Sequence, residues 1–206
     1  TYICVANPGN QTAHLTYRYL LDDGTAIVTT HEVEGQRRMT VHAGGDHPLV
    51  DAASGFSTEI TSDLPVVAER AMYWQKPYTQ WREGHASNGL TTVGEAWAVA
   101  DGRVGGSEGY ETYLLLMNPG TTDSQVRVTF LREGGLPALV KTTTLVAGSR
   151  LTLPSTLLAP ELSNERFGIL AEVISGPLVV AESAMYWNAG GTFWASGTSA
   201  PGVRMR

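Results

Sequence analysis

Apolar and polar residues alternate one by one over several short stretches of this chain. The stretch 14–20 (HLTYRYL) places Leu15, Tyr17 and Tyr19 on one face, and the stretch 126–131 (VRVTFL) repeats the alternation. A period of two is the pattern of a half-buried β-strand. No segment keeps a helical period over four turns, although 155–165 is expected to hold one short helical turn. The pattern therefore predicts an all-β fold.

Turn sequences separate the predicted strands. DDG and EGG follow the two alternating stretches, and such residues favour tight hairpin connections. Strands of about six residues at spacings of roughly 8–12 are typical of β-sandwiches. We therefore predict two tandem immunoglobulin-like β-sandwich modules. The further strands are expected at 25–33, 38–41, 55–63 and 66–74 in the first module, and at 138–146, 150–153, 167–175 and 178–187 in the second.

The chain contains one unit twice. TYICVANPG (Thr1–Gly9) aligns with TYLLLMNPG (Thr112–Gly120), and ERAMYW (Glu69–Trp74) aligns with ESAMYW (Glu182–Trp187). The order of the matching phrases is the same in both copies. This indicates an internal duplication, and we place the module boundaries at 1–93 and 94–206.

Six phrases in a fixed order resemble a known bacterial repeat: TYLLLMNPG, VRVTFLREGG, AGSRLTL, VVAESAMYW, GHASNG and EAWAVADG. They are similar to a tandem β-sandwich repeat, of unknown function, found in secreted and surface proteins. The resemblance implies an extracellular or cell-surface location and a structural or adhesive role without enzymatic activity. It carries no catalytic residues over to this chain. The partners it implies are other copies or neighbouring modules of the same protein.

The two copies differ at one point. EAWAVADG, which contains Trp97, leads into the second copy, whereas the first copy begins directly at Thr1. If that lead-in is a strand, the first module has an open sheet edge, which proteins rarely leave uncovered. Charges, a neighbouring module or a donated strand could cover it. We consider the segment Gly197–Arg206 of another copy as the donor, which would give a head-to-tail filament.

Composition narrows the classes of partner. The chain has 206 residues, 42% of them hydrophobic, and a net charge of −6. It contains no basic run, so we expect no nucleic-acid partner, and no apolar stretch is long enough for membrane insertion. The single cysteine, Cys4, excludes a disulfide within the chain and is expected to be a small buried residue.

The phrases ERAMYW and ESAMYW each begin with a glutamate. Glu69 and Glu182 have apolar neighbours, so we expect them to be buried and paired, with Arg37 and Arg150 as the available cations. The alternative is a pair of catalytic carboxylates, which would have to lie about 5–10 Å apart. We favour the structural interpretation and assign no catalytic residue.

Histidines and aromatic residues are the remaining candidates. The segment His42–His47 (HAGGDH) is interpreted as a solvated loop, and we expect no metal and no cofactor. Trp stands at both ends of the loops 74–81 and 187–194. These loops either seal the ends of the cores or contact a glycan or a protein. The residues singled out for such contact are Tyr78, Trp81, Phe193 and Trp194.

Overall fold

The computed structural model describes residues 1–74 and 83–206, and the all-β prediction is confirmed. The strands fall close to the ranges predicted from alternation. In residues 1–93, the first half, they are β1 (Tyr2–Asn7), β2 (Ala13–Leu21), β3 (Ala26–Val33), β4 (Arg37–His42), β5 (Phe56–Ser62), β6 (Val67–Trp74) and β7 (Glu83–Asn88). In residues 94–206, the second half, they are β8 (Ala96–Arg103), β9 (Glu111–Asn118), β10 (Ser124–Arg132), β11 (Leu139–Leu145), β12 (Ser149–Pro154), β13 (Arg166–Ser175), β14 (Val180–Ala189), β15 (Thr192–Pro201) and β16 (Val203–Arg204).

The predicted pair of tandem immunoglobulin-like β-sandwich modules is wrong. The strands form four small sheets, arranged as the blades of a four-bladed β-propeller. The strand orders are β4-β1-β6-β7 and β3-β2-β5 in the first half, and β12-β9-β14-β15 and β11-β10-β13-β8-β16 in the second. In the immunoglobulin pattern, strands B and C lie in different sheets, as do C and D. Here the consecutive strands β2 and β3 pair with each other in one sheet, and so do β10 and β11. Alternation and turn chemistry predicted these hairpins, but they do not determine which sheet receives each strand.

Each half has its own hydrophobic core between its two sheets. The core of the first half includes Val5 on β1 and the rings of Tyr17 and Tyr19 on β2. The core of the second half includes Phe130 on β10 and Trp97 on β8. The alternating faces of the strands supply both cores, as half-buried sheets do.

The two halves correspond strand by strand except at one edge. β5 and β13 hold equivalent places, beside β2 and β10 respectively. On its other side, β13 pairs with β8. Within the part of the chain that the structure describes, no strand pairs with the outer edge of β5. The first half therefore has an open edge where the second half has β8.

The C-terminal segment is used within its own half. β15 pairs with β14, and β16 pairs with β8. The segment Gly197–Arg206 is therefore not displayed for donation to another copy, and our choice of this segment as the donor is wrong.

Short helices connect the strands. The expected turn within 155–165 is confirmed as α3 (Ser155–Leu158) and η1 (Pro160–Leu162). The segment interpreted as a loop, His42–His47, instead contains α1 (Ala43–Asp46) and leads into α2 (Pro48–Ala52). None of the helices in the described ranges has the length and apolar character needed to cross a membrane.

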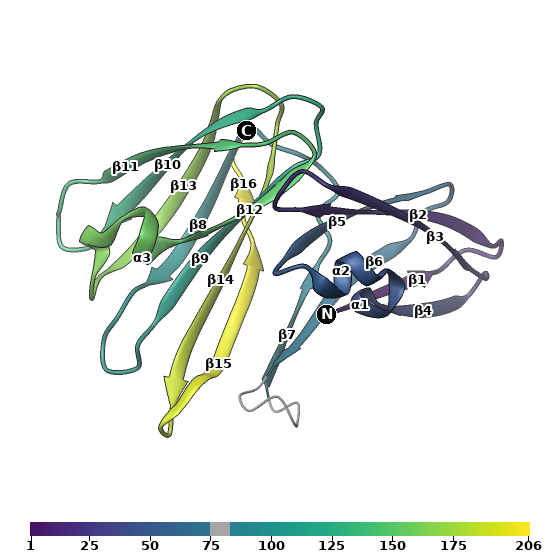
Figure 1. Cartoon of the computed structure of the whole chain (residues 1–206), viewed down its shortest axis with the longest axis horizontal. Coiled ribbons are helices and arrows are strands. Elements are labelled where there is room, and N and C mark those ends of the chain that lie inside the picture. The colour runs from purple at the N-terminus through teal and green to yellow at the C-terminus, as the bar shows by residue number, and fades with distance from the viewer. Residues whose placement is uncertain (75–82) are drawn as a thin grey trace.

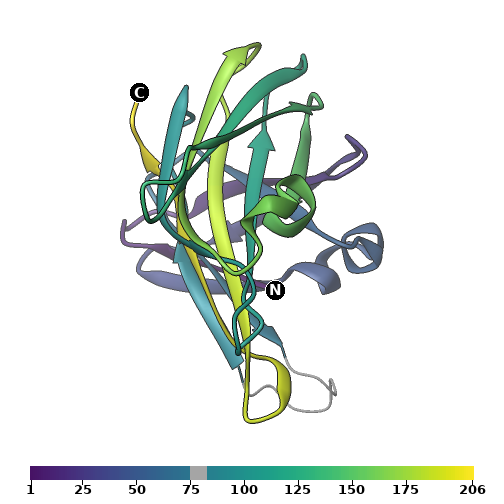
Figure 2. The same ribbon diagram turned by 90° about the vertical axis from the view of Figure 1, so that its left-hand side faces the viewer.

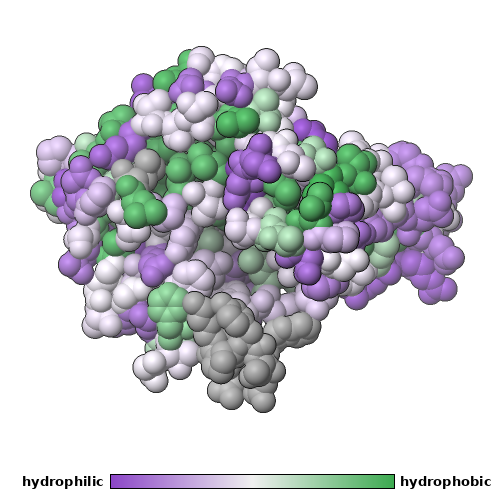
Figure 3. All heavy atoms as spheres, viewed as in Figure 1, coloured by the Kyte–Doolittle hydropathy of each residue, from purple (hydrophilic) through white to green (hydrophobic). Residues whose placement is uncertain are grey.

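The halves meet along β7 and β15, which lie side by side (Figure 1). Figure 2 shows that most strands of the first half cross those of the second at a steep angle. Such crossing sheets cannot pack flat against each other over their whole length. The surface is hollowed where they diverge (Figure 3).

Candidate binding cavity between the halves

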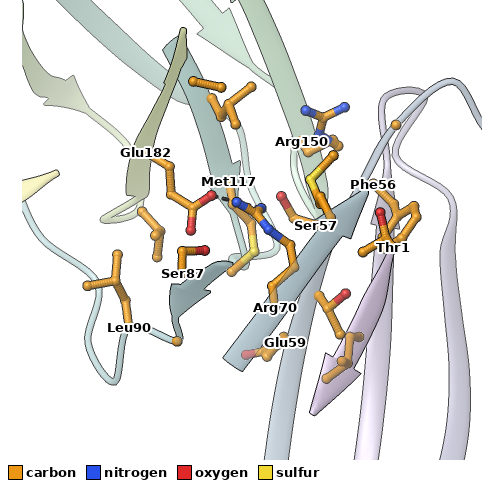
Figure 4. A pocket seen from close by; sticks show the side chains of 18 of the residues that line it. Thr1, Phe56, Ser57, Glu59, Arg70, Ser87, Leu90, Met117, Arg150 and Glu182 are labelled. Carbon is orange, nitrogen blue, oxygen red and sulfur yellow. Dashed lines mark hydrogen bonds and ion pairs between the residues drawn. The ribbon is translucent and has the colours of Figure 1, made fainter. Parts of the chain in front are cut away.

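A cavity of about 890 Å³ lies between the two halves. Strands β5, β6 and β7 line it on one side, and β9, β12 and β14 on the other. Thr1 also borders it (Figure 4). Ligand pockets in proteins have volumes of roughly 300–1,000 Å³. The cavity is large enough for a small ligand or a short peptide segment.

Arg70 and Glu182 bridge the two halves inside the cavity. The Nη1 of Arg70 donates to Oε2 of Glu182 at 2.9 Å, and the two side chains are 26% and 20% exposed. Arg70 lies directly opposite Ile3 of β1, and residues directly opposite each other share a face. Since Ile3 belongs to the core, Arg70 extends from the inner face of its sheet toward the second half. Figure 4 shows the pair from within the cavity.

A polar network continues from this pair. Nη2 of Arg70 lies 3.4 Å from Oγ of Ser199, which lies 2.9 Å from Nδ1 of His85. The other ring nitrogen of His85 is 3.4 Å from the hydroxyl of Tyr186. Burial, helped by the charge of Arg70, lowers the pKa of His85 to about 4. The imidazole is therefore neutral at neutral pH.

The Ser199–His85 contact does not complete a nucleophilic triad. In such a triad a carboxylate orients the second ring nitrogen of the histidine. Here that nitrogen faces the hydroxyl of Tyr186, while the carboxylate of Glu182 is held by Arg70. The network joins the two halves and contributes polar side chains to the lining of the cavity.

The predicted buried pairs are arranged differently from our expectation. Glu69 is exposed, because it lies opposite Cys4 on the outer face of its sheet. Arg37 is also exposed. The prediction that Glu69 and Arg37 are buried is therefore wrong. Glu182 is half-buried, but its partner comes from the other half rather than from its own. Glu69 lies on the outer face of its sheet, and Glu182 is held by Arg70 from the inner face, so no contact pairs the two carboxylates within the described residues.

Arg150 is buried at 9% exposure and also contacts the first half. Its Nη1 lies 3.4 Å from Oδ1 of Asp22, and its Nη2 donates to Thr152. Burial lowers its pKa. The guanidinium occupies the space over Gly55, where an added Cβ would lie 1.8 Å from Nη1. A glycine at this position lets the arginine cross between the halves.

The aromatic candidates pack at the junction of the halves. The ring of Trp194 stacks on Tyr186 with centroids 4.9 Å apart, and Nε1 of Trp74 donates to the carbonyl of Trp194 at 3.0 Å. Phe193 stacks on Trp194 and is 44% exposed. Tyr78 and Trp81 lie outside the described residues.

The histidine-rich segment is anchored by Asp46, the carboxylate within the stretch HAGGDH. Oδ2 of Asp46 accepts from the hydroxyls of Tyr19 and Thr29, both at 2.7 Å, and lies 3.2 Å from Nε2 of His31. Burial alone would raise the pKa of Asp46, but these hydrogen bonds hold it below its usual range. In the described ranges, no group of three or more His, Cys, Asp or Glu is placed to hold a metal. Cys4 is half-buried.

The residues of β5 that line the cavity were not predicted from the sequence. Phe56 and Ile60 are half-buried there, although their counterparts Phe167 and Ala171 on β13 are buried. The available signal was the phrase EAWAVADG, which precedes the second copy and forms β8 beside β13. Its consequence for these two side chains follows only once β5 and β13 are known to be equivalent.

Comparisons with known proteins do not identify the chain. No family model and no curated protein matches it. The crystal structure of Thermotoga maritima 1070 is 19% identical, with a TM-score of 0.48, and the match covers 55% of this chain and 97% of that one. The Anabaena sensory rhodopsin transducer is 18% identical, with a TM-score of 0.37, and its match covers 45% and 97%. Both likenesses are too distant to support an argument about fold or function.

Proposed function

We propose that this protein is a non-enzymatic structural or adhesive unit of a bacterial surface protein, which binds an extended polypeptide segment along β5. The observation that carries the proposal is the open outer edge of β5, which borders the 890 Å³ cavity. An open edge presents unpaired backbone donors and acceptors to an incoming strand. Strand addition of this kind combines backbone hydrogen bonds with side-chain pockets.

The direction of the β5 amides can be inferred from the second half. The amide of Val173 on β13 donates to the carbonyl of Glu95 at 2.8 Å, toward β8. Because amides alternate along a strand, those of Ile169 and Ala171 also face β8. Their counterparts on β5 are Thr58 and Ile60, whose amides therefore face the open edge.

Two other functions have less support. A hydrolase would need a poised acid and base, but Glu182 is paired with Arg70, and Glu69 is an exposed residue on the outer face of its sheet. A carbohydrate-binding surface would need an aromatic platform, but Trp74 and Trp194 contact each other and Tyr186 at the junction. Nucleic-acid binding also has little support, because the net charge of the chain is negative and nucleic acids are polyanions.

The proposal is tested by selecting peptides on the whole protein. A random peptide library is panned on the wild type and counter-selected on Thr58→Pro, which removes an outward amide at an edge position where proline is tolerated. Thr61→Glu is the matched control, because Thr61 is exposed on the opposite face of β5. We expect peptides that bind the wild type and Thr61→Glu but not Thr58→Pro.

The opposite result would be peptides that bind all three proteins equally, or none at all. A glycan array run in parallel tests the carbohydrate alternative. Glycan binding lost on Phe193→Ala would favour that function and contradict ours. Antibody labelling of intact cells tests the proposed surface location.

A further inference from the structure

We infer that the segment received by β5 has the sequence pattern of β8 and places a tryptophan opposite Ile60. The inference rests on the proposed function and specifies the partner: an antiparallel strand with small residues on both sides of one Trp. The second half of the same chain provides the template.

In that template, β8 lies along β13 with Trp97 opposite Ala171 and Val99 opposite Ile169. Trp97 is 2% exposed, and its Nε1 donates to the carbonyl of Val179 at 2.9 Å. Ala96 and Ala98 flank it. The strand thus contributes backbone pairing at the edge and one large ring to the core.

The first half retains the receiving surface. Ile60 takes the place of Ala171, and Val66 takes the place of Val179. Both residues line the cavity, as does Phe56. Within the described ranges, no hydrogen bond reaches the carbonyl of Val66. An indole N–H placed as that of Trp97 would supply the missing donor.

The receiving surface of the first half differs from the corresponding surface of the second half at residue 70. Arg70 stands where the second half has Ser183, and its guanidinium reaches across to Glu182. Its Nε is buried and has no hydrogen-bond partner among the residues that the structure describes. A buried donor without an acceptor is costly, so a backbone carbonyl of an entering strand would satisfy it. Arg70 thus offers a polar contact beside the apolar wall formed by Phe56 and Ile60.

The probe is a labelled peptide with the sequence of residues 94–103, GEAWAVADGR, titrated into the whole protein by fluorescence anisotropy. We expect saturable binding that weakens at least about tenfold when the Trp of the peptide is replaced by Ala, since a buried aromatic anchor dominates such contacts. Thr58→Pro should weaken binding by a similar factor, and Thr61→Glu should leave it unchanged.

Hydrogen exchange of the complex locates the peptide. We expect new protection on β5 and none on β13. Protection on β13 would mean that the peptide has replaced β8 in its own sheet, and this would overturn the inference.

A second variant keeps the test independent of peptide affinity. A copy of residues 95–111 placed before Thr1 supplies the strand within the same chain, since Glu111 directly precedes Thr112, the counterpart of Thr1. We expect a raised melting temperature and no binding of the free peptide. The same extension with its Trp changed to Ala should stabilise the protein less.

The outcomes separate this inference from the proposed function. If the β8 peptide fails but unrelated selected peptides bind in a manner that depends on Thr58, the inference is wrong and strand binding stands. If neither binds, both are wrong. A protein that dimerises through paired β5 edges, detected by light scattering and lost in Thr58→Pro, would also overturn the inference, because the occupant would be a second copy.

Discussion

Arg70 and Glu182 form a hydrogen-bonded ion pair at 2.9 Å, although they belong to different halves of the chain. They occupy adjacent, not equivalent, positions of the repeated phrase: Arg70 is the second residue of ERAMYW and Glu182 the first of ESAMYW. The two similar phrases therefore contribute to the contact between the halves. ERAMYW and ESAMYW differ only at their second residue, and in the first half this residue is Arg70, which makes the contact.

Removing the Arg70 side chain should destabilise the protein, because its partner Glu182 loses its cation. We expect Arg70→Met to lower the free energy of unfolding by about 1–3 kcal/mol, because the carboxylate of Glu182 is left half-buried without its cation. Lys141→Met is the control: it breaks the more exposed pair with Glu161 and should cost less than about 1 kcal/mol. The double variant Arg70→Met/Glu182→Leu should recover part of the loss. Strictly additive effects in this cycle would contradict the pairing.

The low pKa of His85 predicts a pH dependence. The pKa of about 4 in the folded protein lies below the ordinary 6.5, so the unfolded chain binds more protons between these values. Stability should therefore fall as the pH drops through this window. His85→Gln should flatten the fall, as measured by urea unfolding at about pH 7.5 and about pH 4.5.

His14 provides a control, because its contribution to stability should depend on pH in the opposite direction to that of His85. Its hydrogen bond to Asp63 raises its pKa, so its contribution to stability is present at low pH and is lost as the pH rises through the raised value. His14→Gln should make the acid-side loss steeper. If His85→Gln and His14→Gln shift the profile in the same direction, the assignment is wrong.

The open edge predicts unequal costs for two equivalent phenylalanines. Phe167 is 3% exposed beneath β8, and Phe167→Ala should cost about 3–5 kcal/mol. Phe56 is its half-buried counterpart, and Phe56→Ala should cost about 1–2 kcal/mol. Urea unfolding followed separately for each half measures both. Equal costs would show that Phe56 is covered as fully as Phe167.

Gly55 and Arg150 are predicted to be coupled. Gly55→Ala should cost about 1 kcal/mol, because the new methyl group displaces the guanidinium from Asp22. In an Arg150→Met background the same substitution should cost little. An unchanged cost in both backgrounds would mean that the glycine is required by the backbone alone.

Much of the secondary structure could be predicted from the sequence. The alternation in 14–20 and the DDG turn that follows it were sufficient to predict β2 and its hairpin with β3. They were not sufficient for the fold, because the sheet that receives a strand depends on contacts between distant residues. The immunoglobulin-like interpretation failed for this reason.

The candidate site, like the fold, could be predicted from the sequence only in part. Period two indicates that Val67 and Glu69 share one face of β6 and that Ala68 and Arg70 share the other. It does not indicate which face is inside. We chose the face with Glu69, and the structure buries the face with Arg70, since only that face lies on the side of Ile3 and the core. The cavity itself depends on how the halves meet, which no local pattern encodes.

The central claim is that the outer edge of β5 is open in the isolated protein. Amide hydrogen exchange of the whole chain tests it most directly, by comparing β5 with the equivalent strand β13 under one set of conditions. We predict that the amides of Thr58 and Ile60 exchange much faster than those of Ile169 and Ala171, whose edge is covered by β8. Equal protection at the two pairs of amides would contradict the account.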